Sequence, residues 1–278
     1  MLNLKTPQSK LVFGTTLVFL GAFLFFPLIW MFITALKPEG EIFVRLPTLL
    51  PKAPTLDNFR NAMRGDMLLH LRNSLITAGG AAVLTTALAA YAGYSFAKFR
   101  YRGRTALMYL MLSAQMFPFA LLLVSLYPLL QKLDLLNTHF GLIVAYIVLA
   151  LPSGTYMLYS YFVNIPSEIV EAARADGAGE LYIFHRIVLP LALPAMITVG
   201  LYSFMWAWND LLFSLTLITD PALRTVGPGL LQGYLGESRS DWGGAMAASV
   251  LGSLPVVIGF AMLQRFFIQG LTAGAVKS

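Results

Sequence analysis

The sequence predicts an all-helical protein that crosses a lipid bilayer six times. Hydrophobic residues make up 58% of the 278 residues and charged residues only 12%, and the mean hydropathy is +0.72. A soluble domain carries about 25% charged residues, so this chain has too little charge to cover the surface of one. Six apolar runs are each long enough to cross a hydrocarbon core about 30 Å thick.

The first apolar run, residues 11–36, contains no charged residue. It is longer than the apolar part of a signal peptide, and no small-x-small cleavage site follows it, so we expect a retained span. The other predicted spans are residues 71–97, 105–130, 140–163, 187–219 and 245–270. Together with their loops they predict one transmembrane domain over residues 1–278.

Several of these runs contain prolines, such as Pro118, Pro152 and Pro190. Proline inside a span is tolerated where neighbouring helices satisfy the freed carbonyls, so we expect these spans to face protein or a water-filled path. Ala89 and Gly93 lie four residues apart in the second run. Small residues at this spacing let two helix backbones approach closely.

The short segment from Lys98 to Arg104 contains four basic residues in seven. Basic residues in short loops favour the cytoplasmic side. This places the loop, residues 164–186 and both termini in the cytoplasm. A patch that binds lipid or RNA is the alternative to a plain topogenic loop.

The sequence lacks the residues of most catalytic sites. It has no cysteine, no phosphate-binding P-loop and no pair of histidines with metal-ligand spacing. Asp210 is the one acidic residue inside a predicted span. The missing catalytic motifs predict that the chain is not an enzyme. Ion-coupled transport usually leaves several ionisable residues in spans, so the single acid predicts that the energy for transport comes from another source.

The loop over residues 164–186 predicts two short helices joined at Gly177. Pro166 suits the start of a helix, and Glu168 and Glu171 lie in its first turn, where the helix dipole favours acids. Gly177 can end this helix in a left-handed conformation, and a second helix begins near Ala178. The loop is polar on one face and small on the other, and bulky side chains are missing where such a helix would meet another surface, which suits docking into a protein cleft; the alternative is an ordinary linker.

Three motifs resemble those of a known family. The pattern E-A-A-x-x-D-G-A from Glu171, followed by F-x-x-I-x-L-P from Phe184, resembles the EAA loop of ABC importer permeases. The pattern F-x-x-x-W-N-D from Phe204 resembles carbohydrate-uptake permeases, and residues 264–277 resemble the closing segment of their MalG-like branch. The resemblance covers nearly the whole chain, with Ser278 as a departure where glycine is expected.

The resemblance implies a six-helix permease of the MetI-like fold in a bacterial or archaeal inner membrane. It implies four partners besides the bilayer and a carbohydrate substrate: a second homologous permease, two cytoplasmic ATPase subunits and an extracytoplasmic solute-binding protein. It implies no cofactor in this chain, since ATP and Mg²⁺ bind to the ATPases, and no nucleic acid.

The resemblance also implies roles for individual residues. The coupling helix that seats in the ATPase comprises Glu171, Ala172, Ala173, Asp176, Gly177 and Ala178, and Glu171 is expected to pair with a basic residue there. Gly274 and Lys277 of the C-terminal tail are expected to add ATPase contacts.

Two external features have open alternatives. Trp208, Asn209 and Asp210 lie near the outer interface and are candidates for the translocation path, but Trp206 and Trp208 also suit an interfacial aromatic belt. Residues 37–70 and 216–244 are candidates for contact with the solute-binding protein, or plain connecting loops.

The expected function is a permease subunit that transports a sugar or related carbohydrate by alternating access driven by the partner ATPases. The alternative is an ion-coupled transporter or channel without an ATPase, which ATP dependence of uptake would distinguish. A membrane scaffold without a transport role fits the EAA loop poorly.

Overall fold

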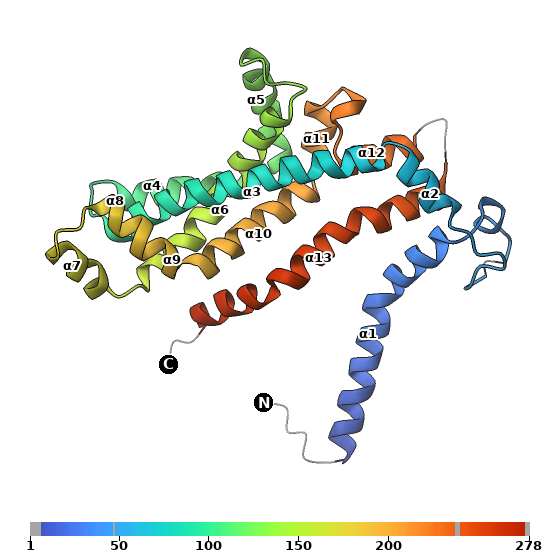
Figure 1. Ribbon diagram of the computed structural model, residues 1–278, viewed down its shortest axis with the longest axis horizontal. Coiled ribbons are helices and arrows are strands. Elements are labelled where there is room, and N and C mark those ends of the chain that lie inside the picture. Colours follow the sequence, from blue (N-terminus) through green and yellow to red (C-terminus); the bar gives the residue numbers. More distant parts are fainter. Residues whose placement is uncertain (1–6, 47, 237–239, 276–278) are drawn as a thin grey trace. The chain divides into compact units, whose positions relative to one another are not determined.

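The computed structural model describes residues 7–46, 48–236 and 240–275, and within these ranges the regular structure is entirely helical (Figure 1). From residue 265 onward it describes the backbone alone. This agrees with the predicted all-helical class.

The chain forms two compact units. Unit 1 comprises residues 1–67 and 230–254, and unit 2 comprises residues 68–229 and 255–278. The sequence predicts one transmembrane domain over residues 1–278. The unit boundaries fall within helices α3 (Met67–Lys98), α12 (Val226–Tyr234) and α13 (Trp242–Ala275).

Unit 1 contains α1 (Pro7–Ala35), η1 (Glu39–Glu41), α2 (Asp57–Arg64) and the beginning of α13. The side chains of α1 are mostly exposed and apolar, as expected of a helix surrounded by lipid. The amide of Asn58 donates to the carbonyls of Ala35 and Lys37, both at 2.9 Å, and so ties α2 to the end of α1. The carboxylate of Glu41 accepts from the backbone N–H groups of Lys52 and Ala53.

Unit 2 is built around α3, α6 (His139–Val163) and α10 (Leu193–Trp208), which run along one another (Figure 1). Helices α3 and α6 meet at Gly93, where an added Cβ would lie 2.9 Å from the backbone nitrogen of Tyr159. Ala89 is fully buried one turn away. The close approach predicted from this pair of small residues is confirmed.

Four helices are long and apolar enough to cross a membrane: Ser9–Ala35, Met67–Lys98, His139–Val163 and Trp242–Gln264. Two further candidates are bent pairs. Arg104–Met116 and Phe119–Lys132 meet at 102°, and Glu180–Leu191 and Leu193–Trp208 meet at 78°. The described residues therefore hold six candidate spans if each bent pair counts as one.

The first bend lies where α4 (Arg104–Ser113) and η2 (Ala114–Met116) give way to α5 (Phe119–Lys132). Phe117 is extended, with φ −73° and ψ 137°, because a residue before proline is disfavoured in the helical conformation. Pro118 then precedes the new helix. The predicted run 105–130 is thus two helices, not one.

The predicted span 187–219 is also divided in the structure. It contains the end of η3, α9 (Leu189–Leu191), α10 and α11 (Leu212–Leu217), followed by η4 (Pro221–Leu223). Short helices α7 (Ser167–Ala175), α8 (Glu180–Ile183) and η3 (Phe184–Val188) precede it. Helices α7 and α11 lie at opposite ends of the bundle of unit 2 (Figure 1).

Candidate functional site

The predicted coupling segment contains one well-defined helix, α7. It begins at Ser167, directly after Pro166, and ends in a left-handed residue, Gly177, with φ +82°. The N–H of Gly177 donates to the carbonyl of Arg174, and that of Ala178 donates to the carbonyl of Ala173, both at 3.0 Å. These two bonds form a complete Schellman cap, so the predicted helix ending at Gly177 is confirmed.

Helix α7 has two chemically different faces. Val170 and Ala173 are buried against the rest of unit 2, with 2% and 9% of their surface exposed. Glu171, Ala172 and Asp176 are exposed. The predicted coupling residues therefore do not share one face, because Ala173 points toward the bundle and not outward.

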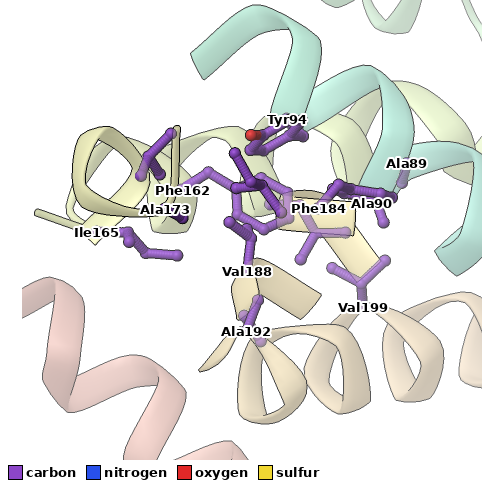
Figure 2. Close-up of a cluster of buried hydrophobic side chains, with 14 residues drawn as sticks. Ala89, Ala90, Tyr94, Phe162, Ile165, Ala173, Phe184, Val188, Ala192 and Val199 are labelled. Carbon is purple, nitrogen blue, oxygen red and sulfur yellow. The ribbon is translucent and has the colours of Figure 1, made fainter. Parts of the chain in front are cut away.

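A hydrophobic cluster of buried residues lies beneath α7 (Figure 2). Tyr94 of α3 packs edge-on against Phe162 of α6, with ring centroids 5.8 Å apart, and lies 4.9 Å from the ring of Phe184 in η3. Ala173 of α7 and Val199 of α10 belong to the same cluster. Close packing of this kind transmits displacement, so α7 is mechanically joined to three long helices.

An ion pair closes the turn after α7. Nε of Arg174 donates to Oε1 of Glu180 at 2.6 Å, across the Gly177 cap. This hydrogen bond raises the pKa of Arg174, so its charge is secure at any physiological pH. Both side chains are about two-fifths exposed, and pairs at such positions contribute only about 0–1 kcal/mol. The pair orients the two helices more than it stabilises them.

The chain returns to the membrane through α8, η3 and α9, where the sequence predicts a single second helix from about Ala178. The segment η3 is a π-helix in which the N–H of Leu189 donates to the carbonyl of Phe184. Pro190 has no N–H and crowds the carbonyl four residues before it, which favours a wider turn at this point. The π-helix is not predicted from the sequence, although Pro190 is the signal for it.

At the opposite end of unit 2, the side chain of Asp210 caps α11. Its carboxylate accepts the backbone N–H groups of Phe213 at 3.2 Å and Ser214 at 2.9 Å. It also accepts the hydroxyl of Tyr146 from α6 at 2.9 Å. Asp210 is 8% exposed. Its oxygen atoms are thus engaged in holding the turn between α10 and α11 to α6.

Trp208 and Asn209 differ in exposure. Trp208 is buried and stacks on Phe204, with ring centroids 5.3 Å apart. Asn209 is exposed, and its amide nitrogen donates to the carbonyl of Met205 at 2.8 Å. Of the three residues predicted for the translocation path, Asn209 is the one with an accessible polar group.

A cavity of about 550 Å³ opens beside Asn209. Its walls are mostly aromatic and aliphatic, and the lining residues are Phe119, Tyr202, Met205, Trp206, Asn209, Asp210, Leu211 and Leu212. Trp206 contacts Phe119 edge-on at 5.8 Å. Flat aromatic surfaces with a few polar groups are typical of small-molecule sites.

The loop after α11 is held by hydrogen bonds to two segments that are distant in the sequence. The amide of Asn73 donates to the carbonyls of Ala222 and Arg224, both at 2.9 Å. The side-chain oxygen of Asn137 accepts the N–H groups of Thr219 and Asp220. Within unit 2, the first part of the predicted binding-protein segment 216–244 is therefore a fixed surface. No local sequence signal indicates these pairings.

The residues of the C-terminal tail that are predicted to contact the ATPase lie at or beyond the last described residue. Gly274 lies in the last turn of α13, where the structure describes the backbone alone. Lys277 lies outside the described residues.

These features define a class of protein: a helical membrane subunit that presents a short, firmly anchored helix at one end and a lined cavity at the other. Residues 82–273 match the family described as the inner membrane component of binding-protein-dependent transport systems, and the chain belongs to this family.

Curated relatives align with most of the chain. The sulfoquinovosyl glycerol transport system permease protein SmoH of Agrobacterium fabrum is 38% identical, over 91% of this chain and 88% of its own. The trehalose/maltose permease protein MalG of Thermococcus litoralis is 35% identical over 91% of each chain. The diacetylchitobiose permease protein DasC of Streptomyces coelicolor is 33% identical over 95% of this chain and 96% of its own.

Solved structures of ABC transporters share the fold. A chain of a bacterial importer of alginate superposes with a TM-score of 0.80, at 20% identity, over 94% of this chain and 98% of its own. A chain of the MetNI methionine transporter superposes with a TM-score of 0.56, at 19% identity, over 78% of this chain and 99% of its own. The predicted MetI-like permease fold is confirmed.

Family membership confirms the importer interpretation over the ion-coupled alternative. The chain is a transport permease subunit and not an enzyme, because ATP hydrolysis in ABC transporters resides in separate ATPase subunits. As an inner membrane component of a binding-protein-dependent system, it works with ATPase and binding-protein partners.

Proposed function

We propose that this chain is a permease subunit for the import of a sugar or related carbohydrate. Its relatives are named for sulfoquinovosyl glycerol, trehalose or maltose, and diacetylchitobiose. These compounds share a polyhydroxylated ring joined through a glycosidic bond. The aromatic walls of the cavity and the exposed Asn209 in its lining suit such a ligand, because sugar rings present apolar faces and hydroxyl edges.

The exposed face of α7 carries the proposal for coupling. Glu171, Ala172 and Asp176 are exposed on a helix whose other face is buried in the bundle. We infer that this face, with Gly177 and Ala178 at its end, seats in a groove of the ATPase. The small side chains allow close approach, and the Glu171 carboxylate pairs with a basic residue of the partner.

The proposed mechanism is alternating access driven from α7. ATP and Mg²⁺ bind to the partner ATPases, and closure of the ATPase dimer displaces α7. Ala173 and Val170 pack into the cluster shared by α3, α6, η3 and α10, so the displacement reaches the membrane helices as a rigid movement. The helices then open the path toward the outside.

The proposed assembly contains a second homologous permease and two ATPase subunits. The N terminus, residues 98–104, α7 and the C terminus face the cytoplasm of a bacterial or archaeal cell, and Gly274 and Lys277 add ATPase contacts. The solute-binding protein docks on extracytoplasmic segments, for which residues 37–70 and residues 216–244 are the candidates. The hydrogen bond from Lys98 Nζ to the carbonyl of Ile165 supports this topology, because it joins the basic loop to the start of the α7 segment.

The proposed translocation path passes Asn209 at the outer cavity. Trp208 and Asp210 act there as positioning residues, since Trp208 is buried on Phe204 and the carboxylate of Asp210 caps α11. Trp206 lines the cavity and offers its ring as a stacking surface.

The test is the charge reversal Glu171→Lys in the assembled transporter, reconstituted in proteoliposomes. Breaking a desolvated charge pair at an interface costs about 2–5 kcal/mol, so binding-protein-dependent uptake is expected to fall at least roughly tenfold. Lys132→Glu, a reversal on the exposed end of α5, is the matched control and should leave uptake unchanged. Normal uptake and normal stimulated ATP hydrolysis in Glu171→Lys would refute the coupling role.

A further inference from the structure

A cluster of arginines lies on the loop between α3 and α4. We call residues 98–104 the arginine loop. Arg100 and Arg102 are exposed and Arg104 is partly exposed. The ion pairs found among the described residues join Arg60 to Asp57 and Arg174 to Glu180, so the three arginines of this loop lack an acidic partner there.

The arginine loop forms one wall of a cavity of about 300 Å³. The cavity is lined by Arg100, Tyr101, Gly103, Arg104, Thr105 and Ala106, and none of these residues is acidic. Gly103, with φ +85°, turns the chain sharply into α4. Nη1 of Arg104 donates to the carbonyl of Phe99 at 3.0 Å, which holds its guanidinium over the loop.

The chemistry of this cavity suits a phosphate group. Guanidinium groups bind phosphate oxygens through two parallel hydrogen bonds. Thr105 and Ala106 belong to the first turn of α4, a ten-residue helix whose first N–H groups lack partners within the helix. Two arginines and the first turn of a helix therefore converge on one hollow without a neutralising carboxylate.

The surface next to the cavity is apolar and continuous with a membrane-spanning segment. Leu107, Tyr109 and Leu110 of α4 are 51%, 68% and 68% exposed. A free inorganic anion would leave this apolar surface exposed to water. The acyl chains of a lipid would cover it, since the arginine loop joins two segments of the membrane domain and so lies at the level of the headgroups.

We propose that the arginine loop is a binding site for the phosphate headgroup of an anionic phospholipid of the cytoplasmic leaflet, with the acyl chains along α4. The site adjoins the coupling segment. Nζ of Lys98 donates to the carbonyl of Ile165 at 2.7 Å, and Ile165 is a member of the cluster beneath α7. A lipid bound here restrains the hydrophobic cluster against which α7 packs.

The test measures retention of phosphatidylglycerol by the full-length chain, purified with its co-purifying subunits. The protein is reconstituted in nanodiscs of phosphatidylcholine with one-fifth phosphatidylglycerol, released into detergent, and examined by native mass spectrometry. The variant is Arg100→Gln/Arg102→Gln/Arg104→Gln. The matched control, Arg45→Gln/Arg64→Gln/Arg72→Gln, removes three other exposed arginines.

Each basic residue near a headgroup contributes about fivefold to binding of an anionic lipid, so the loop variant should retain at least roughly tenfold less phosphatidylglycerol, and the control should retain the normal amount. The triple Arg→Lys variant should recover part of the binding. Competition by 10 mM inorganic phosphate should be weak.

Three results would overturn the proposal. Equal losses from the loop variant and the control would show general attraction between charges and no site. Full displacement by inorganic phosphate would assign the cavity to a free anion. Unchanged lipid retention, with loss of a co-purifying ATPase, would assign the arginine loop to a protein interface.

Discussion

The removal of the Asp210 carboxylate should destabilise the end of unit 2 where α11 meets α6. In Asp210→Ala, the hydroxyl of Tyr146 and the N–H groups of Phe213 and Ser214 lose their common acceptor. The site is 8% exposed, so water replaces the acceptor poorly. Each unsatisfied buried donor costs about 1–3 kcal/mol, and relief of the buried charge offsets part of the sum, which leaves a net loss of about 3 kcal/mol.

Two smaller substitutions should cause smaller losses of stability at the same site. Asp210→Asn keeps one acceptor oxygen and should cost about 1 kcal/mol, as should Tyr146→Phe, which removes one donor. The double variant Asp210→Ala/Tyr146→Phe should cost less than the sum of the single variants. In the double variant the hydroxyl left unpaired by the loss of Asp210 is itself absent.

The assay is thermal unfolding of the purified chain in detergent, followed by the intrinsic fluorescence of tryptophan, since Trp208 lies two residues from Asp210. At about 2–4 °C per kcal/mol, Asp210→Ala should lower the midpoint by about 6–12 °C. The KM of reconstituted uptake should stay near that of the unchanged chain. An unchanged midpoint with a raised KM would refute the capping role and place the carboxylate on the substrate.

Two glycines give further predictions. Gly177→Ala should lower uptake several-fold, because a residue with a Cβ costs about 1 kcal/mol at φ +82°. Gly177→Asn should recover uptake, since asparagine tolerates the left-handed conformation. Equal defects in both variants would show that the flexibility of glycine matters and not the left-handed cap. Gly93→Ala should lower the thermal midpoint by about 2–12 °C, since its Cβ would lie 2.9 Å from the Tyr159 nitrogen. Gly79→Ala on the same helix, with open space around it, should leave the midpoint unchanged. Similar midpoints for the two variants would contradict close packing of α3 on α6.

The features that local chemistry decides could be predicted from the sequence. The helical class follows from composition and from the length of the apolar runs. Helix α7 could be placed to within one residue, because Pro166 and Gly177 carry the information for its two ends. The close approach at Gly93 follows from small residues spaced by one helical turn.

The features that depend on distant partners could not be predicted. The role of Asp210 depends on Tyr146, 64 residues earlier, and nothing near Asp210 distinguishes a cap from a group on a transport path. Asn73 holds a loop about 150 residues away in the sequence. The bend at Pro118 was open to two outcomes, because a proline inside an apolar run can be absorbed by a kink or can start a new helix.

The adjacent alanines of the EAA motif are small for two different physical reasons. Ala172 is exposed, so a small side chain there keeps the surface of α7 open to a partner. Ala173 is buried in the cluster with Tyr94 and Phe184, so a small side chain there lets α7 sit close to the membrane helices. A helix that only docked would need no anchor, and one that only packed would need no exposed Glu171. Helix α7 has an exposed face with Glu171 and Ala172 and a buried face with Ala173. A helix needs two such faces if it is to receive a displacement on one face and transmit it from the other.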